Sequence, residues 1–219
     1  MKFQAVDISK TATAAQVIFA SLRRAILDGD LQDGEPLRQD EIAKAFHTSR
    51  FPVREALTLL EQQGLVKTQR YKGAVVATLS MQEASEIFDF RAKLEADVIR
   101  AAVPKLSPET LNEARGFLER FACARNPMDY GVLNRQFHAS PYSVSGLPYH
   151  LSVIESSIDR IDRYIRAQLV MSGIARSNDE HLKILEACEA GDADLAARLT
   201  YDHIHDAKDA LQAQLKRNS

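Results

Sequence analysis

The stretch 39–63 constrains the fold most strongly, because it contains two helical patterns separated by only two residues. Apolar residues recur at helical spacing up to Phe46 and again from Ser49 onward. Between them, His47 and Thr48 leave room for one tight turn. Two helices joined by so short a turn are typical of the helix-turn-helix, whose second helix enters the major groove of DNA.

The flanking segments predict a winged form of this motif. A further helical pattern begins near Ala14 and stops at Gly29, a residue type that commonly ends helices. After the helix-turn-helix, the runs 65–68 and 74–77 resemble two short strands, with a hairpin tip at 69–73 between them. Three helices followed by a hairpin predict a winged helix-turn-helix domain.

From Ser80 onward the sequence contains no further strand-like run, and a capping box at Ser80 opens a long helix. The later predicted helices lie at about residues 108–124, 128–140, 147–172, 178–190 and 192–216. The chain is therefore expected to be mainly α, with an N-terminal winged helix-turn-helix that includes a small β-hairpin and a C-terminal all-α helical bundle. The expected parts are a flexible N-terminus at 1–12, the winged domain at 13–78 and the helical domain at 80–216.

Two local signals set helix ends within the predicted bundle. Pro141 directly follows the predicted helix at 128–140. A proline inside a helix costs about 3 kcal/mol unless the helix ends or kinks there. We therefore expect a break near residue 140. Ser177 stands three residues before Glu180, a second capping box, which predicts a helix start at that point.

Composition places the chain among globular proteins that do not cross a membrane. Hydrophobic residues make up 45% of the sequence, which is enough for real cores, while no apolar run approaches the ~20 residues of a membrane span. The N-terminus lacks a signal-peptide pattern, so a cytoplasmic location is expected. Cys123 and Cys188 each lie in an apolar helical pattern and are expected to be buried thiols.

Basic residues around the second helix of the motif are candidates for DNA contact. Residues 1–76 hold 11 Lys and Arg against 9 Asp and Glu, a small positive excess that permits nucleic-acid binding. Arg50 and Arg54 are four residues apart and share a helix face, where arginine pairs well with guanine. The alternative is that both are surface charges paired with Glu55 or Glu61. The predicted DNA-contacting set is Arg38, Thr48, Ser49, Arg50, Pro52, Arg54, Arg70, Lys72 and Gly73.

These motifs resemble the GntR family of bacterial transcription regulators. The run 49–57 (SRFPVREAL), the run 60–66 (LEQQGLV) and the run 73–76 (GAVV) carry the resemblance. It implies a double-stranded DNA operator as the partner. Many relatives carry a DNA-contacting arginine near position 40, where this chain has Asp40 and Glu41. The resemblance therefore places most base reading on residues 48–54, with Arg38 as a substitute contact from the preceding helix.

Three histidines of the helical half are predicted to point inward from different helices. They are His138, His181 and His203, and each has apolar neighbours at helical spacing. Imidazoles from facing helices suit zinc, nickel, iron or copper, with a fourth position open to water or a ligand. The alternative is that the histidines only stabilise the helical fold.

The helical half resembles the FCD domain, the effector domain of FadR-like GntR regulators. The segments 91–95 (RAKLE), 134–138 (NRQFH) and 180–187 (EHLKILEA), with His203, carry the resemblance. It implies a divalent transition metal, expected to be zinc or nickel, and a small carboxylate effector. It also implies that the chain forms a homodimer. Asn134 stands where many members have Asp, so the predicted ligand set is His138, His181 and His203, supplemented by Asn134, Asp97 or a bound acid. Arg91 and Arg163 are the expected partners of the effector carboxylate.

Together these features predict a sequence-specific transcription regulator, with repression as the expected mode, rather than an enzyme. Two alternatives remain at this point. The histidine set could serve a metal-dependent enzyme, although no general base stands beside it in the sequence. The chain could also be a DNA-binding protein whose histidines are only structural.

Overall fold

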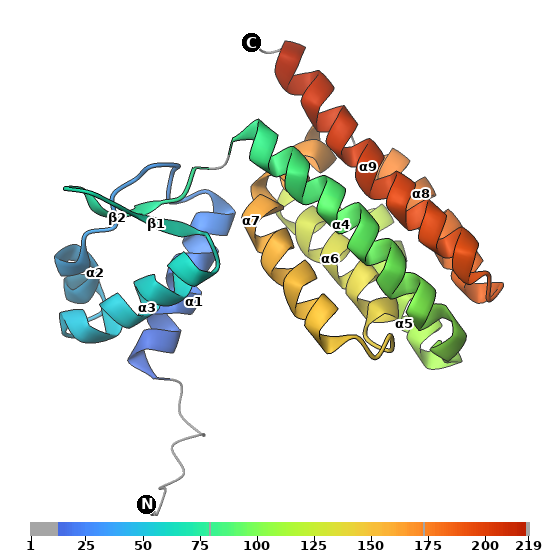
Figure 1. Cartoon of the computed structure of the whole chain (residues 1–219), viewed down its shortest axis with the longest axis horizontal. Helices are drawn as coiled ribbons and strands as arrows, with labels where there is room; N and C mark the ends of the chain where they lie inside the picture. The colour runs from blue at the N-terminus through green and yellow to red at the C-terminus, as the bar shows by residue number, and fades with distance from the viewer. Residues whose placement is uncertain (1–12, 79, 173, 218–219) are drawn as a thin grey trace, which may run out of the picture. The chain divides into compact units, whose positions relative to one another are not determined.

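The computed structural model describes residues 13–78, 80–172 and 174–217, and the chain divides into two compact units with their boundary after Thr78 (Figure 1). The first unit contains three helices and a two-stranded antiparallel sheet. Its elements are α1 (Ala14–Asp28), α2 (Gln39–Ala45), α3 (Arg50–Gln62), β1 (Val66–Gln69) and β2 (Gly73–Val76). The strands pair from Val66 with Val76 to Gln69 with Gly73.

The first helix owes its limits to its caps. Thr13 and Gln16 form a capping box at the start of α1, and Gly29 ends the helix with φ 81°, a left-handed conformation that glycine adopts without penalty. The buried residues Ile18, Leu22 and Ile26 line one face of α1. The inner face of α3 meets them in one apolar cluster, built from Val53, Ala56, Leu57 and Leu60.

The turn between α2 and α3 is closed by backbone hydrogen bonds. His47 adopts a positive φ of 50°, and the amide of Thr48 donates to the carbonyl of Ala43 at 2.9 Å. The predicted turn is therefore present. The segment before α2 also joins the sheet, because Pro36 forms a bridge with Val75 and flanking amides bond along β2. That third partner of the hairpin had no signal in the sequence.

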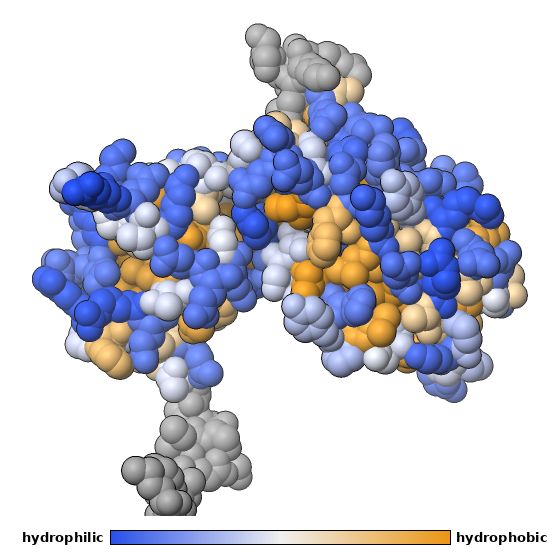
Figure 2. Space-filling model, in the orientation of Figure 1, coloured by the Kyte–Doolittle hydropathy of each residue, from blue (hydrophilic) through white to orange (hydrophobic). Residues whose placement is uncertain are grey.

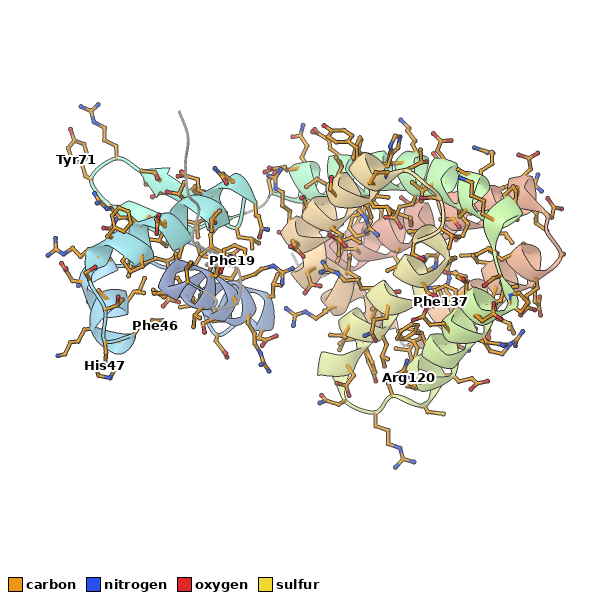
Figure 3. The ribbon with its side chains drawn as sticks, turned by 90° about the horizontal axis from the view of Figure 1, so that it is seen from below. Phe19, Phe46, His47, Tyr71, Arg120 and Phe137 are labelled. Carbon is orange, nitrogen blue, oxygen red and sulfur yellow. The ribbon has the colours of Figure 1, made fainter. Side chains whose placement is uncertain are left out.

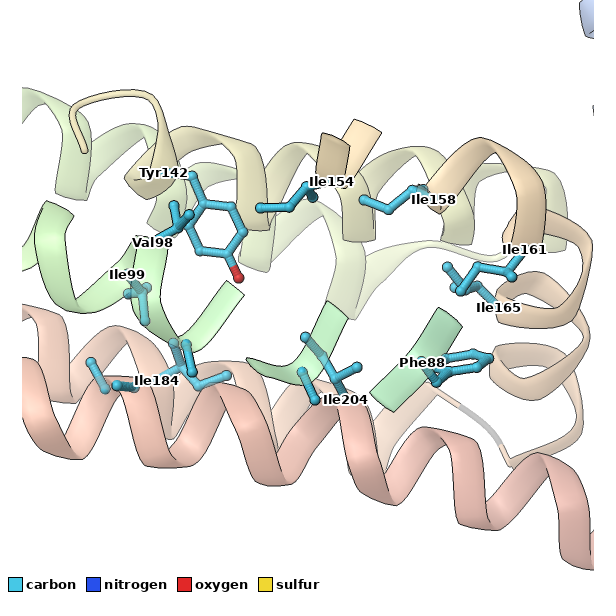
Figure 4. Packing of buried hydrophobic residues seen from close by; sticks show 14 of the residues in the cluster. Phe88, Val98, Ile99, Tyr142, Ile154, Ile158, Ile161, Ile165, Ile184 and Ile204 are labelled. Carbon is cyan, nitrogen blue, oxygen red and sulfur yellow. The ribbon is translucent and has the colours of Figure 1, made fainter. Parts of the chain in front are cut away.

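The second unit is a helical bundle. Its elements are α4 (Met81–Ala102), a short 3₁₀ turn η1 (Val103–Lys105), α5 (Pro108–Cys123), α6 (Pro127–Tyr142), α7 (Pro148–Ser172), α8 (Ile174–Glu189) and α9 (Ala193–Arg217). Figure 1 shows α4 beside α9, which is the most extensive helix pairing of the unit. Buried isoleucines and aromatics fill the space between the helices, as Figure 4 shows for Phe88, Ile161 and Ile204. None of the described helices is both long and apolar enough to cross a membrane.

One predicted helix end is close, and one predicted helix start is wrong. The helix α6 ends at Tyr142, close to the break expected near residue 140, with Pro141 in its last turn. The Tyr142 ring is buried, and Figure 4 shows it among Val98, Ile99 and Ile154. The helix α8 begins at Ile174, so Ser177 is a buried residue inside the helix rather than its cap. Cys188 is buried as expected, whereas Cys123 is exposed at the end of α5.

Candidate nucleic-acid interface and histidine site

The N-terminal end of α3 presents polar groups to solvent. Ser49 precedes the helix in extended conformation, and its side chain makes no capping hydrogen bond. Both Ser49 and Arg50 are exposed, and Thr48 is half-buried. The first amides of a helix have no partner within the helix and attract anions. This end of α3 can therefore receive a phosphate.

The arginines of the motif are held by acidic residues of α2, not by those expected from the sequence. Arg50 forms an ion pair with Asp40 through its Nε atom. Arg38 pairs with Glu41 at 3.2 Å on the same helix. Glu61 instead accepts a hydrogen bond from the amide of Thr68 at 2.9 Å. Arg50 is therefore an ion-paired surface charge, as that alternative supposed, but its partner is Asp40 and not Glu55 or Glu61.

The remaining predicted DNA contacts lie on the exposed surface of the same unit. Arg54 is exposed one turn beyond Arg50, and Pro52 is half-buried beside it. At the hairpin tip, Arg70 and Lys72 are exposed on either side of Tyr71, whose ring lies 5.0 Å from the Arg70 guanidinium. Figure 3 shows Tyr71 projecting from this tip. Gly73 allows the turn through its φ of 75°.

The three predicted inward histidines meet inside the helical unit. His138 of α6, His181 of α8 and His203 of α9 are all buried, and one nitrogen from each lies within 4.8 Å of the others. The Nε2 atoms of His181 and His203 are 3.1 Å apart. Tetrahedral zinc with Zn–N bonds of about 2.0–2.1 Å places its nitrogen ligands about 3.3 Å apart. The separation of His181 and His203 is thus close to what a metal requires.

A carboxylate fixes which nitrogen of His203 faces the cluster. Glu180 accepts from the Nδ1 atom of His203 at 2.7 Å, so the Nε2 lone pair of His203 faces His181. Arg176 holds Glu180 in turn at 2.8 Å. These partners keep the pKa of Glu180 below its usual value, because hydrogen bonds from His203 and Arg176 outweigh the effect of burial, which alone would raise it.

A second buried chain of contacts leads from His138 to an ion pair. The Tyr142 hydroxyl lies 3.3 Å from Nδ1 of His138 and donates to Glu95 at 3.0 Å. Glu95 is fully buried and accepts from Nε of Arg91 at 2.7 Å. Arg91, the predicted effector residue, therefore carries a charge that Glu95 already balances.

Protonation of two histidines is opposed by the fold. Burial lowers the pKa of His138 well below 6.5, and the neighbouring His203 and Arg91 lower it further. Burial, followed by the positive charge that His203 and His138 would carry, likewise lowers the pKa of His181. Both imidazoles are therefore neutral in the folded protein at neutral pH, which is the form that binds metals.

These shifts predict that chelator-treated protein loses stability in mild acid. Because the unfolded chain binds protons on these histidines near pH 6.5 and the folded chain does not, stability falls as the pH drops below that value. Each such histidine contributes about 1.4 kcal/mol per pH unit, so two contribute up to about 3 kcal/mol. Thermal denaturation between about pH 7.5 and 5.5 measures the effect.

The control for this experiment is His47→Asn, which alters an exposed histidine of the other unit at a left-handed position that asparagine tolerates. The variant should show the same loss as the native chain. A melting temperature that does not change over this range would contradict the neutral, buried state of His138 and His181.

A small cavity of about 20 Å³ adjoins the histidines. Its polar lining comes from Arg91, Asn134, His138 and His203, and the rest is apolar. A volume of this size holds about one water molecule. Asn134 is buried here, as its proposed role beside the histidines requires.

Two other predicted site residues do not join this group. Asp97 is wrong as a metal ligand, because its carboxylate is exposed and pairs with Arg100 at 2.8 Å. Two residues are about half a helical turn, so Asp97 faces outward while Glu95 faces the core. The side chain of Arg163 lies outside the described residues. Arg160 and Arg166 form ion pairs with Glu83 and Asp162.

Glu180 and Tyr142 are the site residues that the sequence did not single out. Glu180 was noted only as part of a capping box, although its place beside His181 and one turn from Arg176 was visible. Tyr142 follows Pro141, which indicated that the helix ends before it, so the tyrosine was not assigned to the helix that carries His138. Its contact with Glu95 joins residues 47 positions apart and has no local signal.

A winged helix-turn-helix unit followed by an all-helical unit defines a two-domain transcription regulator. The chain belongs to the GntR family of bacterial regulatory proteins: the model of that family matches residues 14–76, and the model of the FCD domain matches residues 86–206. The resemblances and the fold class predicted from the sequence are thereby confirmed.

Individual relatives agree over nearly the whole chain. The HTH-type transcriptional repressor RspR of Escherichia coli K12 is 26% identical over 97% of this chain and 95% of its own. The gluconate operon transcriptional repressor of Bacillus subtilis is 26% identical over 94% of this chain and 87% of its own. These relatives are regulators, which fits a chain that is not an enzyme.

Solved structures show the same architecture. A GntR family member from Pseudomonas syringae pv. tomato is 33% identical, with a TM-score of 0.57 over 94% of this chain and 89% of that one. McbR/YncC of E. coli has a TM-score of 0.77 over 94% of this chain and all of its own, at 21% identity, and indicates the fold alone.

Proposed function

We propose that this GntR regulator acts as a repressor whose helical unit binds a divalent transition metal and a small carboxylate, and that this binding alters its affinity for the operator. The convergence of His138, His181 and His203 in one buried group is the observation that carries the proposal. Zinc and nickel are the metals that such a set of imidazoles suits.

The residues of the group fit a metal on two counts. The Nε2 atoms of His181 and His203 face each other at 3.1 Å, near the separation of two nitrogen ligands of one metal ion. The histidine pKa shifts favour neutral imidazoles, and the Glu180 contact leaves Nε2 of His203 available. When bound, a divalent metal supplies positive charge and an open coordination position at these nitrogens.

The charges around the group favour an anionic second ligand. Imidazoles are neutral when they bind a metal, so three of them and the amide of Asn134 would bring no negative charge to a bound cation. The charge of Arg91 is already balanced by Glu95. A carboxylate restores the balance, and the guanidinium of Arg91 lines the cavity where it can donate further hydrogen bonds. A small carboxylate is therefore the expected effector class.

The size of the cavity links effector binding to a change of conformation. Its volume of about 20 Å³ has room for about one water molecule, which is less than a small carboxylate occupies. Admission of an effector must therefore displace side chains of α4, α6, α7 or α9, which form the walls. A ligand shifts a conformational equilibrium only if it prefers one state, and an effector that needs the enlarged cavity has that preference.

Operator binding is assigned to the first unit. The exposed end of α3, with Arg50 and Arg54, is placed to read base edges, and Thr48 and Ser49 to hold a phosphate. Arg70, Lys72 and Gly73 of the hairpin tip supply backbone or minor-groove contacts. We expect a homodimer on a pseudo-palindromic operator. Figure 2 shows apolar areas on one face of the helical unit, and apolar surface of this kind is what a second copy covers.

The proposal is tested by a thermal-shift screen of small mono- and dicarboxylates on the full chain, with zinc present or with a chelator. At least one acid should raise the melting temperature in zinc, because a ligand present at 100 times its Kd stabilises the protein by about 2.7 kcal/mol. With the chelator the same acid should give no shift.

Stabilisation that is equal with and without chelator would remove the metal from the proposal. If neither zinc nor any acid has an effect, the histidines serve the fold alone. The packing of the His181 ring on Phe121 and Phe137 at centroid distances of 5.3 and 4.5 Å favours that second candidate.

A further inference from the structure

The ion pair between Asp40 and Arg50 joins the two helices of the helix-turn-helix. Asp40 lies in the first turn of α2, and Arg50 is the first residue of α3. Both side chains are exposed, at 66% and 67% respectively, so packing does not fix the position of either. The contact spans the turn and brings a carboxylate to the arginine at the end of the recognition helix.

The atom that Asp40 engages determines what Arg50 can still do. The guanidinium is planar and carries five N–H donors, of which one is on Nε and four on the two terminal nitrogens. The ion pair brings the carboxylate of Asp40 against Nε. The described residues offer the two terminal nitrogens no hydrogen-bond partner, so this edge remains available. It is the edge that can donate two parallel hydrogen bonds to O6 and N7 of guanine.

We propose that Asp40 is a positioning residue, which holds the Arg50 guanidinium so that its terminal edge reads a guanine in each operator half-site. The inference rests on the proposed role of α3 in base reading. A long arginine side chain that is already ordered loses less freedom on binding, which is worth about threefold to tenfold in affinity. This gain in affinity applies only to sites where Arg50 contacts its guanine, so it is observed as a stronger preference for guanine.

Asp40 also acts on affinity in the opposite direction. A carboxylate near the DNA backbone repels phosphates at every site, whatever the sequence. Its removal should therefore leave non-specific binding unchanged or stronger while weakening the preference for guanine. A change of specificity without loss of general binding distinguishes positioning from simple stabilisation of the fold.

The pair formed by Glu41 and Arg38 provides a matched control. Glu41 is the next residue of α2, is 69% exposed and pairs with Arg38 at 3.2 Å. The variant Glu41→Ala removes the same charge from the same helix turn but leaves the contact between Asp40 and Arg50 intact. It should alter general affinity as Asp40→Ala does and leave the guanine preference unaltered.

The experiment selects binding sites from a random duplex DNA library with the full-length native chain and with the variants Asp40→Ala, Glu41→Ala and Arg50→Ala, followed by sequencing. The native chain should select one strongly preferred guanine per half-site that Arg50→Ala no longer selects. Asp40→Ala should reduce the preference at that position by about threefold to tenfold, with the other positions unchanged. The double variant Asp40→Ala/Arg50→Ala should match Arg50→Ala.

An Asp40→Ala chain that keeps the full guanine preference would overturn the inference, and so would equal losses at all positions. A failure of the proposed function gives a different result. In that case Arg50→Ala selects the same sites as the native chain, or the native chain selects none. Asp40→Asn, which keeps an acceptor oxygen, should give an intermediate preference and thereby show that the contact matters.

Discussion

Replacing Arg50 with alanine is expected to weaken binding of the selected operator at least about 30-fold, because each bidentate contact to guanine is worth about 1–3 kcal/mol. A homodimer loses one such contact in each half-site, so a loss of about 2 kcal/mol or more is expected. Arg50 is exposed, and its removal leaves the apolar cluster of the unit intact. The folded state should therefore be preserved.

The measurement is a fluorescence anisotropy titration of operator duplex at one fixed salt concentration, since affinities for DNA depend steeply on salt. Arg24→Ala is the matched control. Arg24 is an exposed arginine of the same unit, paired with Asp28 in the last turn of α1 rather than placed on α3. It should bind almost as the native chain does. Equal affinities for Arg50→Ala and the native chain would contradict the assignment of α3 to base reading.

The winged unit could be predicted from the sequence because its signals are local. Gly29 ends α1 in the left-handed conformation that favours glycine. The two residues between the predicted helices, His47 and Thr48, permit only one tight turn. The alternating strands also fall close to their predicted places. The bridge between Pro36 and Val75 could not be predicted, since it pairs residues 39 positions apart through backbone atoms alone.

The histidine group was predicted in part, because helical periodicity is also a local signal. Helical periodicity showed that His138, His181 and His203 face the core, and the structure brings them together. Periodicity places Asp97 on the side of α4 opposite to Glu95, and Asp97 proved to be exposed. Periodicity does not reveal contacts between helices, such as the one that holds His203 on Glu180.

The second large effect is expected for His203→Gln. This variant removes one of three imidazoles and the link to Glu180, while glutamine keeps a similar length. Loss of a partner outside the ligand set already lowers metal affinity about 10- to 100-fold, so loss of a ligand should lower zinc affinity at least about 100-fold. Zinc should raise the melting temperature of the native chain and leave that of His203→Gln unchanged.

His205→Gln provides the control on the same helix. His205 lies two residues from His203, is 35% exposed and contacts Asp209 rather than the other histidines. Its replacement changes the histidine content equally and leaves the buried group intact. Its response to zinc should therefore match that of the native chain, which separates the buried site from zinc binding at surface histidines.

Calorimetric titration of zinc into the chelator-treated native chain tests the central claim most directly. We expect one tight zinc ion per chain, retained in His205→Gln and lost in His203→Gln. A native chain that takes up no zinc would contradict the claim that His138, His181 and His203 form a metal site. An unchanged affinity in His203→Gln would contradict it equally.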